Sequence, residues 1–129
     1  SAFARAGLGV HMSDAFLNDL AMQLREFARE RDWEQFHSPK NLAMALVVEG
    51  GELLEQFQWL TPEQSANPDQ DRVQRISDEM ADVLIYLVRL ADSLDVDLAE
   101  AVQSKLAHNR EKYPAEKVRG DARKYNEYD

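Results

Sequence analysis

The chain has 129 residues, of which 44% are hydrophobic and 30% are charged, a balance typical of a single globular domain and not of a disordered chain. Its 24 acidic and 15 basic residues give a formal net charge of −9 at pH 7, which argues against nucleic acid as a partner, because phosphate backbones bind basic surfaces. The absence of cysteine excludes disulfides and thiolate chemistry.

No segment at the start of the chain has the continuous apolar stretch of a signal peptide, and His11 precedes a Met-Ser pair typical of a cloning junction. We therefore interpret residues 1–11 as a vector-derived or disordered leader and residues 12–129 as one domain with a C-terminal tail. The longest purely apolar run, residues 42–48, is too short to span a bilayer, so we expect a cytoplasmic protein with no membrane partner.

Apolar residues at three- and four-residue spacing predict a first helix from about Asp14 to Arg31. A second helix is predicted to begin at Ser38, because serine caps helices and the following proline fits the first helical position, and to run to about Trp59. Two prolines with asparagine and serine predict a loop over residues 61–68.

A third helix is predicted over about residues 70–92, and a fourth from Asp97, with Glu100 three residues on as in a capping box, to about Lys112. No segment alternates as a strand does, so the predicted fold class is all-α, a four-helix arrangement. The second and third helices are apolar on more than one side. Because one small bundle cannot cover that surface, we expect a homodimer or homotetramer.

Two pairs of carboxylates lie within these two apolar helices. Glu49 and Glu52 are three residues apart, as are Glu79 and Asp82, so each pair shares one face of its helix. Charges in an apolar setting are costly unless they are paired or bind a metal, and few basic residues lie nearby. Four oxygen ligands without cysteine or histidine suit Mg²⁺, with Mn²⁺ as a possible substitute.

The acids have two other interpretations. An isolated pair of this spacing is usually a solvated helix face, but two pairs within apolar helices favour a metal site. A di-iron carboxylate bundle requires Glu-x-x-His on two helices, and the chain has this spacing once, from Glu34 to His37. Gly50 and Gly51 lie beside the first pair, and each costs roughly 1 kcal/mol relative to alanine inside a helix. Together they suggest close approach of another helix or of a ligand, although a simple helix kink is the alternative.

An acidic chain can bind a polyphosphate if a divalent metal supplies the positive charge. A nucleoside triphosphate bound in this way also needs cations on its outer oxygens and a surface for its base. Lys105 and Asn109 share one face of the fourth helix, with Tyr113 just beyond it. Trp33 and Trp59 bracket the second helix and could stack on a base, and Tyr86 lies on the face of Asp82. For each, the plain alternative is a core or solvated side chain.

A resemblance to a known family rests on RDWEQFHSPKNL at residues 31–42, EGGEL at 49–53, FQW at 57–59 and DEMADVLIY at 78–86, together with residues 105–114. These segments resemble the MazG-type all-α nucleoside triphosphate pyrophosphohydrolases, and within them the dCTP pyrophosphatase branch. The resemblance covers about Leu24 to Tyr125. It departs at Leu24, where animal relatives carry histidine, so it leaves the preferred base open.

This resemblance implies Mg²⁺-dependent hydrolysis of (deoxy)nucleoside triphosphates, with dCTP or modified dCTP as candidates, to monophosphate and pyrophosphate in nucleotide-pool house-cleaning. It implies a metal site formed by the four acids, and neighbouring subunits that complete the site. It also implies a C-terminal tail, residues 119–125, that folds over the ligand. The implied substrate contacts are Trp33, His37, Asn41, Trp59, Tyr86, Lys105, Asn109 and Tyr113.

The predicted mechanism is attack of water on the α-phosphorus with one carboxylate as base. Glu52 is our choice, and Glu49 and Glu79 remain alternatives. The opposing class is a non-enzymatic helical interaction module with its acids on the surface, which would show no metal-dependent thermal shift. A hydrolase of another phosphoanhydride is a third possibility, which a substrate panel separates.

Overall fold

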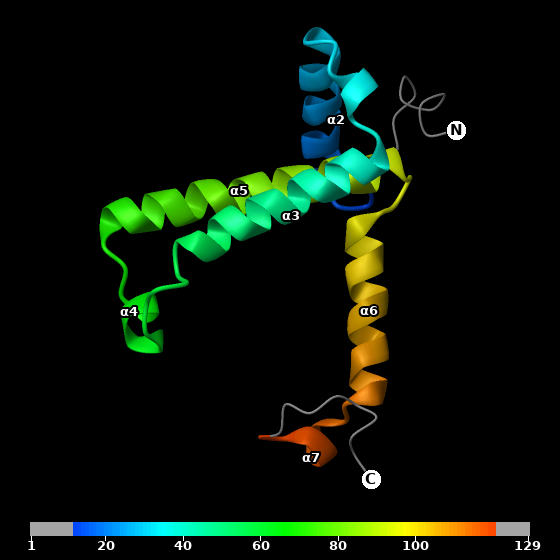
Figure 1. The fold of residues 1–129 in the computed structure, drawn as a ribbon. Helices are drawn as coiled ribbons and strands as arrows, with labels where there is room; N and C mark the ends of the chain where they lie inside the picture. Colours follow the sequence, from blue (N-terminus) through cyan, green and yellow to red (C-terminus); the bar gives the residue numbers. More distant parts are fainter. Residues whose placement is uncertain (1–11, 121–129) are drawn as a thin grey trace.

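The computed structural model describes residues 12–120, which are helical with short connections and contain no strand (Figure 1). The predicted all-α class is confirmed. The proposed leader and the predicted tail contacts beyond residue 120 lie outside the described residues. The elements are α2 (Ala15–Glu30), η1 (Glu34–Phe36), α3 (Pro39–Glu55), α4 (Pro62–Ala66), α5 (Gln70–Ser93), α6 (Leu98–Lys112) and α7 (Ala115–Val118).

Side-chain caps explain where the four long helices of this part begin. Asp14, Ser38, Asp69 and Asp97 each accept a hydrogen bond from the backbone N–H three residues on, at 2.8–3.4 Å. Such a cap satisfies one of the N–H groups that a helix start leaves unpaired. Asp97 also accepts from the backbone N–H of Ser13 at 2.9 Å, which ties the start of α6 to the start of the described chain.

The loop predicted over residues 61–68 is wrong in its middle, where α4 forms. The Thr61 hydroxyl accepts from the Gln64 backbone, and the Gln64 side chain accepts from the Thr61 backbone, which makes a capping box. Pro62, one of the two prolines that predicted the loop, stands at the first turn of α4, where its missing N–H costs nothing. The helix α3 ends at Glu55 rather than near Trp59, and turns follow it.

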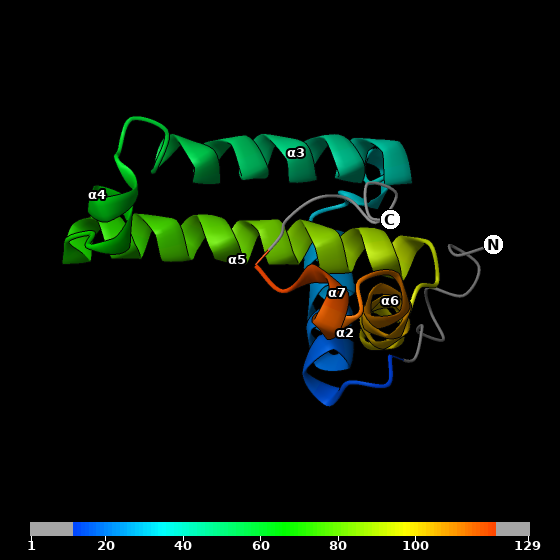
Figure 2. The same ribbon diagram turned by 90° about the horizontal axis from the view of Figure 1, so that it is seen from below.

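The helices α3 and α5 run antiparallel side by side, and α2 packs across the C-terminal half of α5 (Figures 1 and 2). The core lies at this crossing. Its buried members are Met12 and Ala21 from the α2 side and Val88 and Ala91 from α5. Five leucines pack around them: Leu17, Leu20, Leu24, Leu84 and Leu98.

The helix α6 leaves the end of α5 and projects away from the α3–α5 hairpin, so one chain does not close a four-helix bundle (Figures 1 and 2). The hairpin also carries large exposed apolar side chains. Val47 is 73% exposed, Leu54 59% and Met80 57%. These features agree with an oligomer, which stays a prediction. None of the described helices is long and apolar enough to cross a membrane.

Candidate metal and nucleotide site

The facing sides of α3 and α5 bring together three of the four predicted metal ligands. Glu49 from α3 meets Glu79 and Asp82 from α5, and each offers a carboxylate oxygen within 4.8 Å of the others. The three-residue spacing of Glu79 and Asp82 puts both on the side of α5 that faces α3. Side-by-side packing of the two helices therefore builds a group of acidic oxygens from residues thirty positions apart.

Two carboxylate oxygens of this group are removed from solvent and have no hydrogen-bond partner among the described residues. The Oε2 atoms of Glu49 and Glu79 are buried, and no hydrogen bond reaches either of them from the described residues. A buried acceptor without a partner costs about 1–3 kcal/mol, and more when it is charged. A hard cation with oxygen ligands would satisfy both atoms, so the residues present fit a divalent metal.

The group also shifts the ionisation of its members. Burial, followed by the neighbouring Glu52, Glu79 and Asp82, raises the pKa of Glu49 to about 7. Burial likewise raises the pKa of Glu79, and the negative charges of Glu52 and Asp82 add to this, whereas its contact with Glu49 acts in the opposite direction. Like charges held this closely favour the protonated forms until a cation offsets them.

Glu52, the predicted base, lies at the edge of the group. Its carboxylate is near enough to interact with both Glu49 and Glu79, but it does not share the close cluster of oxygens that Glu49, Glu79 and Asp82 form. It is therefore placed differently from the other three acids.

A cavity of about 330 Å³ adjoins the acids between α2, η1 and α5. Asp82 belongs to both the cavity and the acidic group. Trp33, His37 and Tyr86, three of the predicted substrate contacts, line it. The Trp33 ring packs edge-on against Phe27, at 5.6 Å between centroids, and against His37, at 6.4 Å. An aromatic wall next to an acidic group suits a ligand with both a ring and phosphates.

The remaining predicted contacts do not line this cavity. The Asn41 side chain donates to the Phe36 carbonyl at 3.0 Å, joining the start of α3 to η1. Trp59 lies beyond the other end of α3 and is 86% exposed. Three more residues belong to α6 and its end, on the helix that projects away from the hairpin: Lys105, Asn109 and Tyr113.

Packing among the described residues does not require glycine at positions 50 and 51. A Cβ atom at either position would meet nothing within 4 Å among the described residues. The expected close approach of another helix is thus not made by the described part of this chain. The approach of a ligand, or of a helix from a second copy, stays a prediction.

Sequence reasoning missed a buried polar network behind the cavity. Arg89 lines the cavity and is 9% exposed, and Asp92, one turn on, is 5% exposed. Asp92 accepts two hydrogen bonds from Arg25 of α2, both 2.7 Å long, and lies 3.6 Å from Arg89. The signal was available, because Arg89 and Asp92 are charged residues at i, i+3 in the apolar stretch that ends α5.

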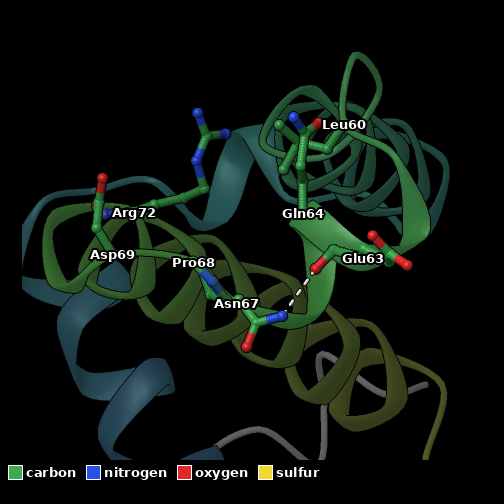
Figure 3. A pocket seen from close by; sticks show the side chains of 7 residues that line it. All are labelled: Leu60, Glu63, Gln64, Asn67, Pro68, Asp69 and Arg72. Atoms are coloured by element: carbon green, nitrogen blue, oxygen red, sulfur yellow. Dashed lines mark hydrogen bonds between the residues drawn. The ribbon is translucent and has the colours of Figure 1, made fainter.

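A second hollow, of about 440 Å³, opens at the tip of the hairpin around α4 (Figure 3). Most of its lining residues are polar, and the Asn67 side chain there donates to the Glu63 carbonyl at 2.9 Å. None of the predicted site residues belongs to it. The lining residues are Leu60, Glu63, Gln64, Asn67, Pro68, Asp69 and Arg72.

The chain is similar to a known family, to named proteins and to a solved structure. A profile of the MazG-like family matches residues 44–128. Proteins named dCTP pyrophosphatase 1 from Mus musculus and Homo sapiens are each 50% identical, over 114 and 113 residues, which is 86% of this chain and 66% of each relative's length. The crystal structure of a pyrophosphatase from Archaeoglobus fulgidus superposes with a TM-score of 0.74 at 39% identity, covering 81% of this chain and 98% of that one.

Proposed function

This chain belongs to the MazG-like family, and on that basis we propose that it hydrolyses (deoxy)nucleoside triphosphates to monophosphate and pyrophosphate, with Mg²⁺ as cofactor. One observation carries the proposal: Asp82 belongs both to the acidic group and to the lining of the cavity, which also contains aromatic side chains. The names of the relatives, dCTP pyrophosphatase 1, support dCTP or modified dCTP as candidate substrates and a house-cleaning role.

The metal would be held by Glu49, Glu79 and Asp82, with Glu52 beside them. Their oxygen-only donor set suits Mg²⁺ and accepts Mn²⁺ as a substitute. The two orphaned carboxylate oxygens support this assignment. When bound, the metal supplies positive charge that neutralises the triphosphate and makes water a better nucleophile.

One of the acids would also act as the general base. Glu52 is proposed to take a proton from the attacking water, because it interacts with the group without sharing its closest oxygens. The water oxygen bonds to the α-phosphorus, the bond from that phosphorus to the α–β bridging oxygen breaks, and pyrophosphate leaves. Glu49 and Glu79 remain the alternative bases.

The cavity would hold the base, with Trp33 stacking on it and His37 and Tyr86 offering hydrogen bonds at its edge. Asn41 would act on the cavity indirectly, since its side chain holds the carbonyl of Phe36 just before His37.

We further propose that a second copy completes the site in a homodimer or homotetramer. Within one chain, Trp59 and the phosphate-binding candidates of α6 stand away from the cavity. The open space over Gly50 and Gly51 and the exposed apolar residues of the hairpin leave room and surface for another chain. Lys105 and Asn109 would then contact the outer phosphates, with Tyr113 near the nucleotide.

Hydrolysis of a panel of canonical and modified triphosphates in ¹⁸O-labelled water tests the proposed function. We expect pyrophosphate release that depends on Mg²⁺, with the label on the monophosphate and none on pyrophosphate. Nucleoside diphosphate and free phosphate as first products would show that the bond assignment is wrong. An absence of both turnover and metal-dependent thermal shift would favour a non-enzymatic module.

A further inference from the structure

We propose that Arg89 is a positioning residue for base recognition: its Nε–H fixes one tautomer of His37, so that His37 presents an Nε2–H donor to an acceptor atom of the base. This inference rests on the proposed function, since it concerns the base bound in the same cavity. Both side chains line that cavity.

The hydrogen bond between the two residues determines the tautomer. The Arg89 Nε atom lies 3.4 Å from the His37 Nδ1 atom and donates to it. Arginine has donors only, so Nδ1 must act as the acceptor and carries no hydrogen. A neutral imidazole in this contact therefore has its hydrogen on Nε2.

The surroundings of His37 favour its neutral form, because their net effect is to lower its pKa. Burial and then the positive charge of Arg89 lower the pKa of His37, and the carboxylate of Glu34 opposes them. A neutral ring offers the base one directed donor, whereas a protonated ring would have to donate from Nδ1 against the Arg89 N–H.

Asp92 and, through it, Arg25 hold the Arg89 guanidinium on the side away from His37. Its Nη1 lies 3.6 Å from Asp92, and Asp92 is held on its other side by the two hydrogen bonds from Arg25. These contacts join α2 to α5 and place the buried Asp92 between two arginines, Arg25 and Arg89. The guanidinium therefore has little freedom to turn away from His37.

The side chains at this end of the cavity favour a base whose facing edge carries hydrogen-bond acceptors. Besides Asp82, which belongs to the acidic group, the cavity is lined by Arg89, whose Nε–H is already bonded to His37, and by three side chains that can face a base. His37 donates from Nε2, the Trp33 indole donates, and Tyr86 can donate or accept. Donors at this end of the cavity match a carbonyl oxygen or an unprotonated ring nitrogen. An amino group turned toward His37 would be left without an acceptor there, at a cost of about 1–3 kcal/mol.

Two variants distinguish the effect of the Arg89 N–H donor from the effect of its positive charge. Arg89→Gln keeps an N–H bonded to Cδ, where arginine has its Nε, but removes the charge. Arg89→Met has a methyl group at the same bond position and no donor. Neither leaves Asp92 unpaired, because Arg25 still donates to it twice. Both are therefore expected to fold.

The direct readout is the tautomer of His37, taken from long-range ¹H–¹⁵N correlations on protein labelled in its three histidines, with His37→Gln to assign the signal. We expect a single Nε2–H tautomer in the unaltered protein and in Arg89→Gln, and a mixture in Arg89→Met. An Nδ1–H tautomer in the unaltered protein, or an unchanged tautomer in Arg89→Met, would overturn the proposal. This measurement needs no turnover, so it stands apart from the proposed function.

The functional readout is KM for dCTP. Arg89→Met should raise KM about tenfold, the effect of one lost hydrogen bond, with kcat little changed and the KM for inorganic triphosphate unaltered. Arg89→Gln should restore most of the loss. In a His37→Gln background the substitution Arg89→Met should change nothing further. If KM stays constant while the tautomer changes, Arg89 has no part in base recognition. If the unaltered protein does not hydrolyse dCTP at all, it is the proposed function that fails.

Discussion

Glu79 carries one of the two orphaned carboxylate oxygens, so the variant Glu79→Gln separates metal binding from folding. We expect it to abolish turnover, with a fall in metal affinity beyond the ~10–100-fold that loss of an outer-shell partner costs. Without Mg²⁺ its thermal midpoint should equal or exceed that of the unaltered protein, because one repelling charge is gone. Calorimetric titration with Mg²⁺ and thermal unfolding in chelator measure the two effects.

The matched control is Asp78→Asn, which removes the same charge from the preceding, exposed position of α5. It should leave both turnover and metal affinity nearly unchanged. If Glu79→Gln instead unfolds the protein, Glu79 has a structural role and the metal assignment loses its support.

The raised pKa of Glu49, about 7 against an ordinary 4.5, predicts how the metal-free protein responds to pH. The folded state binds this proton more tightly than the unfolded state does. The stabilisation is therefore complete below the unfolded value and is lost as pH rises through the folded one. In chelator, the thermal midpoint should fall between about pH 5 and pH 8.

Glu49→Gln should flatten that slope, whereas Glu55→Gln, at an exposed position of the same helix, should not. Saturating Mg²⁺ should reduce the slope, because binding requires the deprotonated carboxylate. A metal-free midpoint that rises across this range would contradict the prediction.

Trp33 and Trp59 lie in very different settings, the first in the wall of the cavity and the second 86% exposed beyond the far end of α3. Replacing either with alanine should weaken nucleotide binding far more than binding of inorganic triphosphate, since only the nucleotide stacks. For Trp33 the expected loss is about 1–3 kcal/mol of binding free energy, measured by competition titration. Equal losses for both ligands would mean that these tryptophans hold the fold and touch no base.

Among the helices, the contact of α2 with α5 depends on a buried ion pair as well as on the apolar core. The side chains of Arg25 and Asp92 are 14% and 4% exposed, so Asp92→Asn would remove a buried negative charge that both Arg25 and Arg89 contact. We expect a loss of about 3–5 kcal/mol of unfolding free energy, measured by urea denaturation. Glu26→Gln breaks the exposed pair with Arg29 and should cost less than about 1 kcal/mol. Similar costs for the two variants would show that the buried pair does not hold α2 in place.

For the whole molecule, the exposed apolar hairpin and the projecting α6 predict association. Sedimentation at micromolar concentration should show a dimer or larger species. Val47→Glu, which puts a charge at a position 73% exposed in one chain, should dissociate it and reduce activity, with helix content unchanged. Phe16→Glu, on α2 and 65% exposed, is the control and should remain associated. A fully active monomer of the unaltered protein would overturn the prediction.

Local chemistry was enough to predict most of the helices. The capping residues Asp14, Ser38 and Asp97 are visible in the sequence, because a cap acts within one turn. The helix α4 was predicted wrongly as a loop, although its cap also acts within one turn. A proline is typical of a loop or of a first helical turn, depending on its neighbours.

The pairing of acids along each helix was likewise determined by the sequence alone, because the helical repeat places residues three apart on one face. Only the tertiary structure decided that Glu49 meets Glu79 and Asp82, that Trp33 and not Trp59 lines this chain's cavity, and that Arg89 reaches His37. These meetings depend on how α2, α3 and α5 pack. Packing brings together residues that are far apart in the chain, and the periodicity within one helix does not show which face of another helix it will contact.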